Sequence, residues 1–157
     1  MRLRVNRLLK MMNSTIEPEG NKRIVFNSPE VVKFVSDRIF GVVDFPPDAP
    51  SIGLEKNGRI IAGVVYTMYT GNGICMHVAA DGKGWMTKNY LYTCFAYPFI
   101  QLACTRVTGL VRADNLKAQK FDEHLGFVRE GVIREGDDDG CDLILYGMLR
   151  RECRWLK

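Results

Sequence analysis

Residues 106–127 have the sequence RVTGLVRADNLKAQKFDEHLGF, and this stretch decides the fold. The residues from Arg106 to Arg112 are typical of a strand. Asn115 can cap a helix that begins at the next residue, because its side-chain oxygen accepts a hydrogen bond from a free backbone N–H group. Gly126 suits the left-handed position just past the end of a helix. The stretch therefore predicts a strand, a short loop and a helix.

The segments on either side of this stretch complete a pattern of strands and helices. Ser28-Pro29 predicts a helix start, since Ser can cap and Pro suits the first helical position. Asn57-Gly58 predicts a tight hairpin turn. Pro98 is expected to kink or loosen the last turn of the second helix. The expected elements are a strand at 23–27, a helix from 29 to about 39 that Gly41 ends, strands at 51–56, 59–69 and 74–80, a helix from 86 to about 102, and strands at 127–135 and 141–150.

This order predicts one α+β domain over residues 21–157. Three consecutive antiparallel strands form a meander, and the segment 74–112 forms a β-loop-α-β crossover between parallel strands. The central sheet is expected to be mixed, with about six or seven strands and flanking helices. The loop after Ala80 then lies at the carboxyl end of a strand, where such sheets bind ligands.

Composition narrows the class of protein. Of the 157 residues, 46% are hydrophobic and 25% are charged, which is typical of a soluble globular domain. No segment approaches the ~20 apolar residues of a membrane-spanning helix. The five cysteines are scattered and form no CxxC pair, so we expect reduced, mostly buried thiols in a cytoplasmic protein and no metal site.

Residues 1–20 form a basic N-terminal arm with four positive charges in its first ten residues. We expect a frayed or helical arm, and contact with nucleic acid or a partner is the alternative. The net charge of +4 favours an anionic ligand. A nucleic-acid-binding protein is a weak hypothesis, because no stripe of aromatic and basic side chains supports it.

The loop 81–87 joins the strand 74–80 to the next helix and is a candidate anion site. Free N–H groups at a helix N-terminus favour negative charge. Gly82 and Gly84 let the backbone approach a phosphate closely, and Lys83 adds a positive charge. A plain tight turn is the alternative interpretation.

The decisive stretch resembles the GNAT family of N-acetyltransferases, and within the family it is most similar in character to short bacteriophage-encoded members. The resemblance rests on Val111-Arg112-x-x-Asn115, on Ala118 three residues later, and on Leu125-Gly126-Phe127. It implies a V-shaped opening between the fourth and fifth strands that binds acetyl-CoA, with no metal. The cofactor-binding residues that it implies are Val78, Ala79, Gly82, Lys83, Gly84, Trp85, Met86, Thr87, Asn115 and Lys120.

Several positions depart from the family pattern. In the loop 81–87, the first residue is Asp81, whose negative charge would repel a phosphate. The sixth is Met86, which is bulky where the family has Gly or Ala. Leu110 stands where ribosomal-protein-type members have a Glu that helps to deprotonate the amine. Asp122 stands where the commonly used Tyr protonates the leaving thiolate.

Other residues are therefore candidates for the proton transfers. His77 is a candidate general base, because an imidazole titrates near neutral pH, and a packed core histidine is the alternative. Tyr66 and Tyr69 are candidate acids, although tyrosines in strands usually serve packing. Arg112 contacts either the substrate or the cofactor, or it forms a structural ion pair with Asp114 or Glu123. We expect the acidic run Asp137–Asp139 to be a solvated hairpin tip.

The resemblance implies direct transfer of an acetyl group from acetyl-CoA to an amine of a protein, peptide or small molecule. The alternative is a GNAT-fold protein with weakened catalysis that serves as a binding or virion-associated module. We expect a monomer or homodimer in the cytoplasm, which is the host cytoplasm if the gene is phage-encoded.

Overall fold

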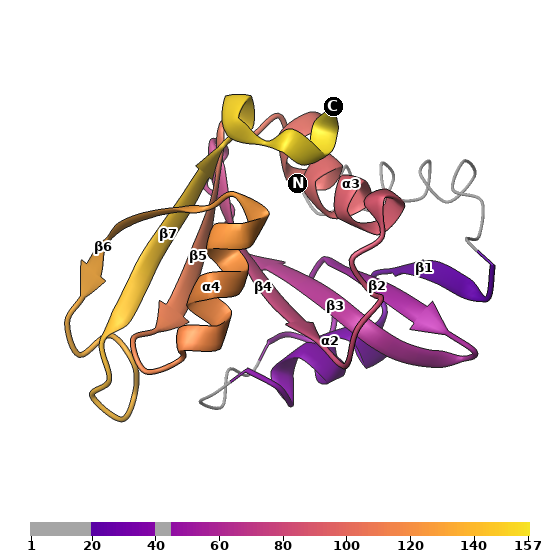
Figure 1. The fold of residues 1–157 in the computed structure, drawn as a ribbon, viewed down its shortest axis with the longest axis horizontal. Coiled ribbons are helices and arrows are strands. Elements are labelled where there is room, and N and C mark those ends of the chain that lie inside the picture. Colours follow the sequence, from indigo (N-terminus) through magenta and orange to yellow (C-terminus); the bar gives the residue numbers. More distant parts are fainter. Residues whose placement is uncertain (1–19, 40–44) are drawn as a thin grey trace.

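The computed structural model describes residues 20–39 and 45–157, so the basic arm at 1–19 and the predicted helix end at Gly41 lie outside the described residues. Its centre is one seven-stranded sheet with the order β1-β2-β3-β4-β5-β7-β6 (Figure 1). The strands are β1 (Lys22–Phe26), β2 (Ser51–Lys56), β3 (Arg59–Thr67), β4 (Gly73–Ala80), β5 (Arg106–Arg112), β6 (Val128–Ile133) and β7 (Leu143–Leu149).

Strands β2, β3 and β4 form the expected antiparallel meander, and β4 and β5 form the expected parallel pair. Strand β1 adds an antiparallel strand beside β2, for which the sequence predicted no partner. Three strands are shorter in the structure than the sequence predicts. The strand predicted at 59–69, which is β3, ends at Thr67, because Met68 adopts a left-handed backbone with φ of 54°. The last two, predicted at 127–135 and 141–150, are confined to their paired residues.

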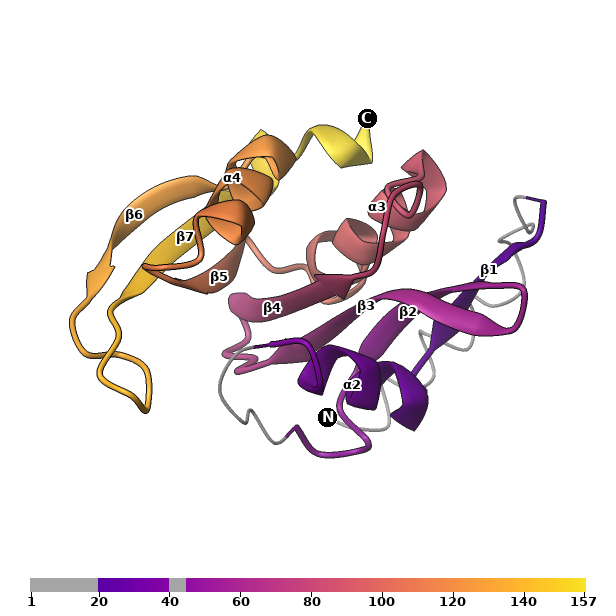
Figure 2. The ribbon, with the colours of Figure 1, turned by 60° about the horizontal axis from the view of Figure 1, so that its bottom comes forward.

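The helices cover both faces of the sheet. Helix α2 (Pro29–Ser36) packs on one face, and α3 (Lys88–Ala96) and α4 (Leu116–Leu125) lie on the other (Figure 2). Ser28 caps α2 as predicted, since its hydroxyl accepts a hydrogen bond from the Glu30 N–H group. Two apolar clusters result, a large one under α3 and α4 and a smaller one under α2.

The predicted helix 86–102 is shorter and ends differently. It begins after Thr87, whose hydroxyl caps it, and its α-helical part ends at Ala96. A π-helical turn follows at Tyr97–Gln101. Pro98 has no N–H group to donate within a helix, which accounts for the loosened last turn that the sequence predicts.

Helix α2 lies close to the sheet because two glycines face it. Gly53 of β2 and Gly63 of β3 are paired opposite each other. A Cβ atom on Gly53 would lie 2.4 Å from Val31 Cγ2, and one on Gly63 would lie 2.8 Å from Val35 Cγ2. The valines of α2 therefore occupy the space that strand side chains would otherwise take.

Two further features concern the cysteines and the lengths of the helices. Cys75, Cys94, Cys104 and Cys153 are buried, as expected, and no cysteine is in a disulfide. Among residues 20–39 and 45–157, no helix is both long and apolar enough to cross a bilayer.

Candidate functional site

Strands β4 and β5 separate partway along their length. They pair at Gly73 with Arg106, at Ile74 with Val107 and at Cys75 with Thr108, and the pairing ends there. A cavity of about 240 Å³ lies in the opening. The strand residues that line it are Met76, His77 and Val78 of β4 and Gly109, Leu110, Val111 and Arg112 of β5. The predicted V-shaped opening between the fourth and fifth strands is thus confirmed.

Helix α4 forms a further wall of the cavity, and its start follows the sequence prediction. The Asn115 side-chain oxygen accepts a hydrogen bond from the Ala118 N–H group at 3.1 Å, which caps the helix. Gly126 ends it with φ of 108°, in the left-handed region. Because residues three or four positions apart share a helix face, Asn115, Ala118 and Asp122 all face the cavity.

The loop between β4 and α3 has the geometry expected of an anion site. Gly82 and Gly84 have φ of 66° and 85°, and nothing lies within 4 Å of a Cβ atom built on either. Within the described part of the chain, the N–H groups of Gly82, Lys83 and Gly84 donate no hydrogen bond. The Thr87 hydroxyl accepts from the Tyr90 N–H group at 3.2 Å and fixes the helix start beside them.

Asp81 is paired with a cation, which corrects the expectation that it would repel a phosphate. The Arg38 Nε and Nη2 atoms donate to its two carboxylate oxygens at 2.8 and 2.7 Å. This bidentate contact lowers the pKa of Asp81 and so keeps it ionised, while the Arg38 charge balances it. The Arg38 guanidinium also lies 3.5 Å from the centre of the Phe34 ring.

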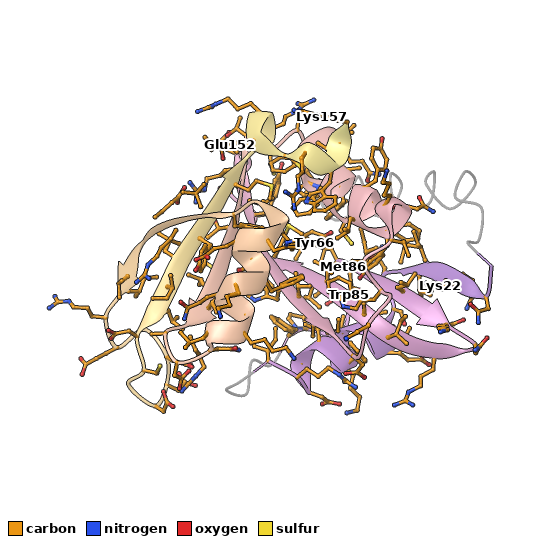
Figure 3. The ribbon with its side chains drawn as sticks, in the orientation of Figure 1. Lys22, Tyr66, Trp85, Met86, Glu152 and Lys157 are labelled. Atoms are coloured by element: carbon orange, nitrogen blue, oxygen red, sulfur yellow. The ribbon has the colours of Figure 1, made fainter. Side chains whose placement is uncertain are left out.

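Trp85 and Met86 differ in their surroundings. Trp85 is buried, and its ring centre lies 5.3 Å from that of Phe121 on α4 and 6.3 Å from that of Tyr90 on α3. Figure 3 shows Trp85 and Met86 beside each other near the middle of the molecule. Met86 is 45% exposed. Lys83 and Lys120 are also exposed. Trp85 therefore links the loop to both helices.

His77 lies in the cavity wall and is mostly enclosed. Its Nε2 atom is 2.7 Å from the Thr67 hydroxyl, and its ring centre is 4.9 Å from that of Phe45. Burial lowers its pKa to about 4, so the imidazole is neutral at pH 7 and is a weak base. These properties favour the packed histidine over the general base.

The two candidate tyrosines do not line the cavity. Tyr66 is fully buried under α3, and its hydroxyl donates to the Cys94 carbonyl at 2.7 Å. Burial raises its pKa well above 10. Tyr69 lies in the turn between β3 and β4, where it packs partly buried against the core. Strand alternation places Tyr66 on the face that α3 covers, which the sequence alone did not indicate.

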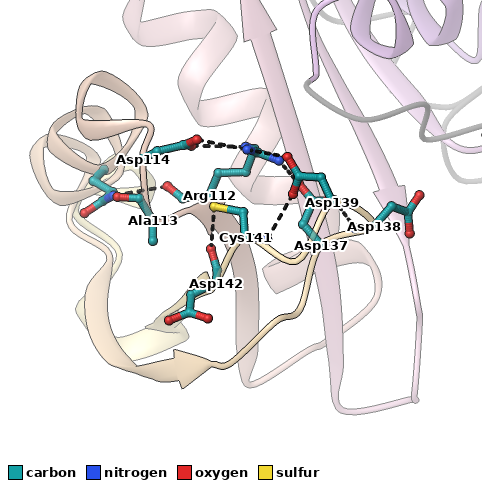
Figure 4. A network of polar contacts seen from close by, with 9 residues as sticks. Arg112, Ala113, Asp114, Asp137, Asp138, Asp139, Cys141 and Asp142 are labelled. Atoms are coloured by element: carbon teal, nitrogen blue, oxygen red, sulfur yellow. Dashed lines mark hydrogen bonds and ion pairs between the residues drawn. The ribbon is translucent and has the colours of Figure 1, made fainter.

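Arg112 is held by three carboxylates at one end of the cavity. It donates to Asp114 at 2.9 and 3.1 Å, to Asp139 at 2.9 Å and to Asp137 (Figure 4). The Asp114 contact is one of the two pairings that the sequence suggested, whereas Glu123 instead accepts from the Tyr146 hydroxyl at 2.9 Å. Since only 17% of the Asp137 side chain is exposed, the hairpin tip is not simply solvated.

Asp122 is the residue whose position the sequence did not explain. It lines the cavity, and no hydrogen bond or ion pair engages its carboxyl group within the described residues. Burial, with a smaller effect of the Glu123 charge, raises its pKa to about 7. A half-buried carboxyl without a partner is a frequent mark of a functional site. Two sequence signals pointed to it, namely its match to the family position of the Tyr that protonates the leaving thiolate and its place on the helix face that Asn115 and Ala118 share.

The described residues contain no group of three or more His, Cys, Asp or Glu side chains arranged to hold a metal ion.

No protein-family model and no curated protein sequence matches the chain. Several solved structures match the fold of the chain. A spermidine N-acetyltransferase SpeG chimera from Vibrio cholerae and hSSAT superposes with a TM-score of 0.67 at 16% identity, over 87% of this chain and 99% of that one. GNAT-family acetyltransferases from Streptococcus pneumoniae and Bacillus anthracis give TM-scores of 0.63 and 0.62 at 17% identity. They cover 82% and 87% of this chain and 98% and 99% of their own. With its seven-stranded sheet, its flanking helices and its opening between β4 and β5, this chain has the fold of the GNAT acetyltransferases.

Proposed function

We propose that this protein is an acyl-CoA-dependent N-acetyltransferase that moves an acetyl group directly from acetyl-CoA to an amine. The observation that carries the proposal is the separation of β4 from β5 beyond Cys75, with the cavity between the two strands. Among the residues that the structure describes, none adds a strand to the β4 edge that faces β5 near Val78 and Ala79. An extended pantetheine chain would pair with this edge as an added strand does.

The loop after β4 fits the diphosphate of such a cosubstrate. Its free N–H groups at Gly82, Lys83 and Gly84 precede the N-terminus of α3, where the helix dipole favours an anion. No Cβ atom obstructs the approach at either glycine. The pairing of Arg38 with Asp81 removes the repulsion that an isolated carboxylate would exert.

The site supplies what acyl transfer requires. Holding the amine and the thioester together removes much of the entropic barrier. The Val78 or Ala79 N–H group would donate to the oxygen on which negative charge develops. His77 would serve as a neutral polar group of the wall, in keeping with its lowered pKa. Arg112 would position the β6–β7 hairpin at the cavity and would not bind the substrate directly.

Two measurements test the proposal in sequence. The first is thermal unfolding with and without acetyl-CoA, since a ligand at 100 times its dissociation constant stabilises a protein by about 2.7 kcal/mol. The second is release of free thiol in the presence of a panel of amines that includes polyamines, peptides and proteins. No stabilisation by millimolar acetyl-CoA would overturn the proposal. Stabilisation without thiol release for any amine would favour the alternative, a binding module with weakened catalysis.

The nature of the acceptor and the setting of the protein are further parts of the proposal. The acceptor is an amine of a protein, a peptide or a small molecule. The spermidine N-acetyltransferase among the similar structures makes a polyamine a reasonable first substrate to assay. A cytoplasmic location, a bacteriophage origin and a monomeric or homodimeric state stay predictions. So does the absence of nucleic-acid and membrane partners.

A further inference from the structure

Asp122 belongs to the cavity wall that α4 provides. Its Oδ2 atom would be 3.1 Å from a Cβ atom on Gly109, so the missing side chain of Gly109 leaves room for the carboxyl group. Asp122 shares the cavity with Met76, His77 and Val78 of β4, on the strand edge that has no partner. The carboxyl group therefore faces the place where a cosubstrate paired with β4 would lie.

Within residues 20–39 and 45–157, the charged groups around Asp122 leave its carboxyl group without a partner. Of the two arginines that line the cavity, Arg38 is engaged by Asp81, and Arg112 by three other carboxylates, Asp137 among them. His77 on β4 bonds to Thr67.

The neighbouring acidic groups act in the same direction. Glu123 follows Asp122 on α4 and accepts from Tyr146 on β7, and its charge disfavours ionisation of Asp122. Burial, with a smaller effect of the Glu123 charge, raises the pKa of Asp122, and no cation of the described residues contacts its carboxyl group. The carboxyl group therefore keeps its proton up to a higher pH than an exposed one.

We propose that the Asp122 carboxylic acid protonates the leaving thiolate, which makes it the general acid of the acetyl transfer; this inference rests on the proposed function. The amine nitrogen forms a bond to the thioester carbonyl carbon, and the C–S bond breaks with its electron pair on sulfur. The proton of Asp122 passes to that sulfur and gives the free thiol. The carboxylate regains a proton, through solvent, from the nitrogen that has become an amide.

The test compares the purified full-length protein with its Asp122→Asn and Glu152→Gln variants. Glu152 lies in the short helix after β7, away from the cavity, and its carboxylate accepts a hydrogen bond from the Leu149 N–H group that an amide oxygen can also accept (Figure 3). The readouts are acetyl-CoA affinity by calorimetry and the turnover number between pH 6 and 9 with a saturating amine.

We expect Asp122→Asn to lower the turnover number at least ~100-fold while acetyl-CoA affinity stays within about twofold, because a positioned acid contributes roughly 10²–10⁴ in rate. In the wild-type protein and in Glu152→Gln, the turnover number should fall as the pH rises, because the acid ionises. The pH profile of Asp122→Asn should lack this alkaline fall. A wild-type profile without the alkaline fall would overturn the inference even if the Asn variant did not fold. If the wild-type protein turns over and Asp122→Asn keeps both the turnover number and the alkaline fall, this inference alone is overturned. If the wild-type protein does not bind acetyl-CoA, the proposed function is overturned together with this inference.

Discussion

The Arg38 guanidinium, two residues past the end of α2, makes two hydrogen bonds to the Asp81 carboxylate at the end of β4. The contact joins residues 43 positions apart in the sequence. It ties α2 to the start of the loop that we assign to the cosubstrate diphosphate. An acidic residue that seemed unfavourable for binding an anion is therefore balanced by a cation from another element.

The first prediction concerns this pair. Arg38→Ala should weaken acetyl-CoA binding about fivefold, because one uncompensated charge near a phosphate contributes about 1 kcal/mol in a solvent-rich site. The double variant Arg38→Ala/Asp81→Asn should regain most of the affinity, as measured by calorimetry. Arg23→Ala is the control, since its ion pair with Glu55 joins β1 to β2. Equal affinity in the single and double variants would contradict the electrostatic role.

The second prediction concerns the contact between α2 and the sheet. Gly53→Ala should lower the free energy of unfolding by about 2 kcal/mol, as overpacking of a core does. Val31→Ala in the same chain should recover part of that loss, because Val31 Cγ2 is the atom that the new methyl group would meet. Gly131→Ala is the control, since nothing lies within 4 Å of its Cβ position. Urea denaturation gives all four values, and a Gly53→Ala protein as stable as the wild type would refute the close packing.

The third prediction is a pH dependence that His77 causes. The pKa of His77 in the native protein, about 4, lies below its ordinary value of 6.5. Between these two pH values, the unfolded chain therefore binds a proton at His77 that the native protein does not bind. Stability from this group is present above pH 6.5 and falls, by up to about 3 kcal/mol, as the pH drops to 4.

Replacing each histidine in turn separates the pH dependence that His77 causes from any that His124 causes. His77→Gln should remove this dependence in denaturation measured at several pH values, and His124→Gln, on the exposed face of α4, should keep it. We also expect His77→Gln to lower turnover by less than tenfold, and a larger loss would restore the general-base interpretation.

The fourth prediction is an opposite pH dependence from Asp122. Its native pKa of about 7 lies above the ordinary 3.8, so stability from this group is present below pH 3.8 and is lost as the pH rises to 7. The loss is at most about 4 kcal/mol. Asp122→Asn should therefore be more stable than the wild type at pH 8, and the advantage should shrink toward pH 4.

The Glu152→Gln variant again serves as the control for the loss of one carboxylate. A stability difference for Asp122→Asn that is the same at pH 4 and pH 8 would show that the carboxyl group is not kept neutral by the fold. Because the effects of His77 and Asp122 oppose each other, the wild-type protein by itself should show only part of either.

Local features of the chain were predictable from the sequence. Ser28, Asn115 and Gly126 mark helix ends where the sequence placed them, because caps and left-handed residues depend on the backbone within a few positions. The strand Arg106–Arg112 and the parallel crossover followed from the same local order. The position of the opening between β4 and β5 came from the resemblance, and the structure contains it.

Only the tertiary structure decided how distant side chains meet. It placed Tyr66 under α3, paired Arg38 with Asp81, and engaged Arg112 with the hairpin. It also left Asp122 in the cavity with no cation of the described residues in contact, which makes the residue at the family's Tyr position a candidate acid. Helix caps and turns are fixed by hydrogen bonds between near neighbours, whereas burial and ion pairing depend on which elements the folded sheet brings together.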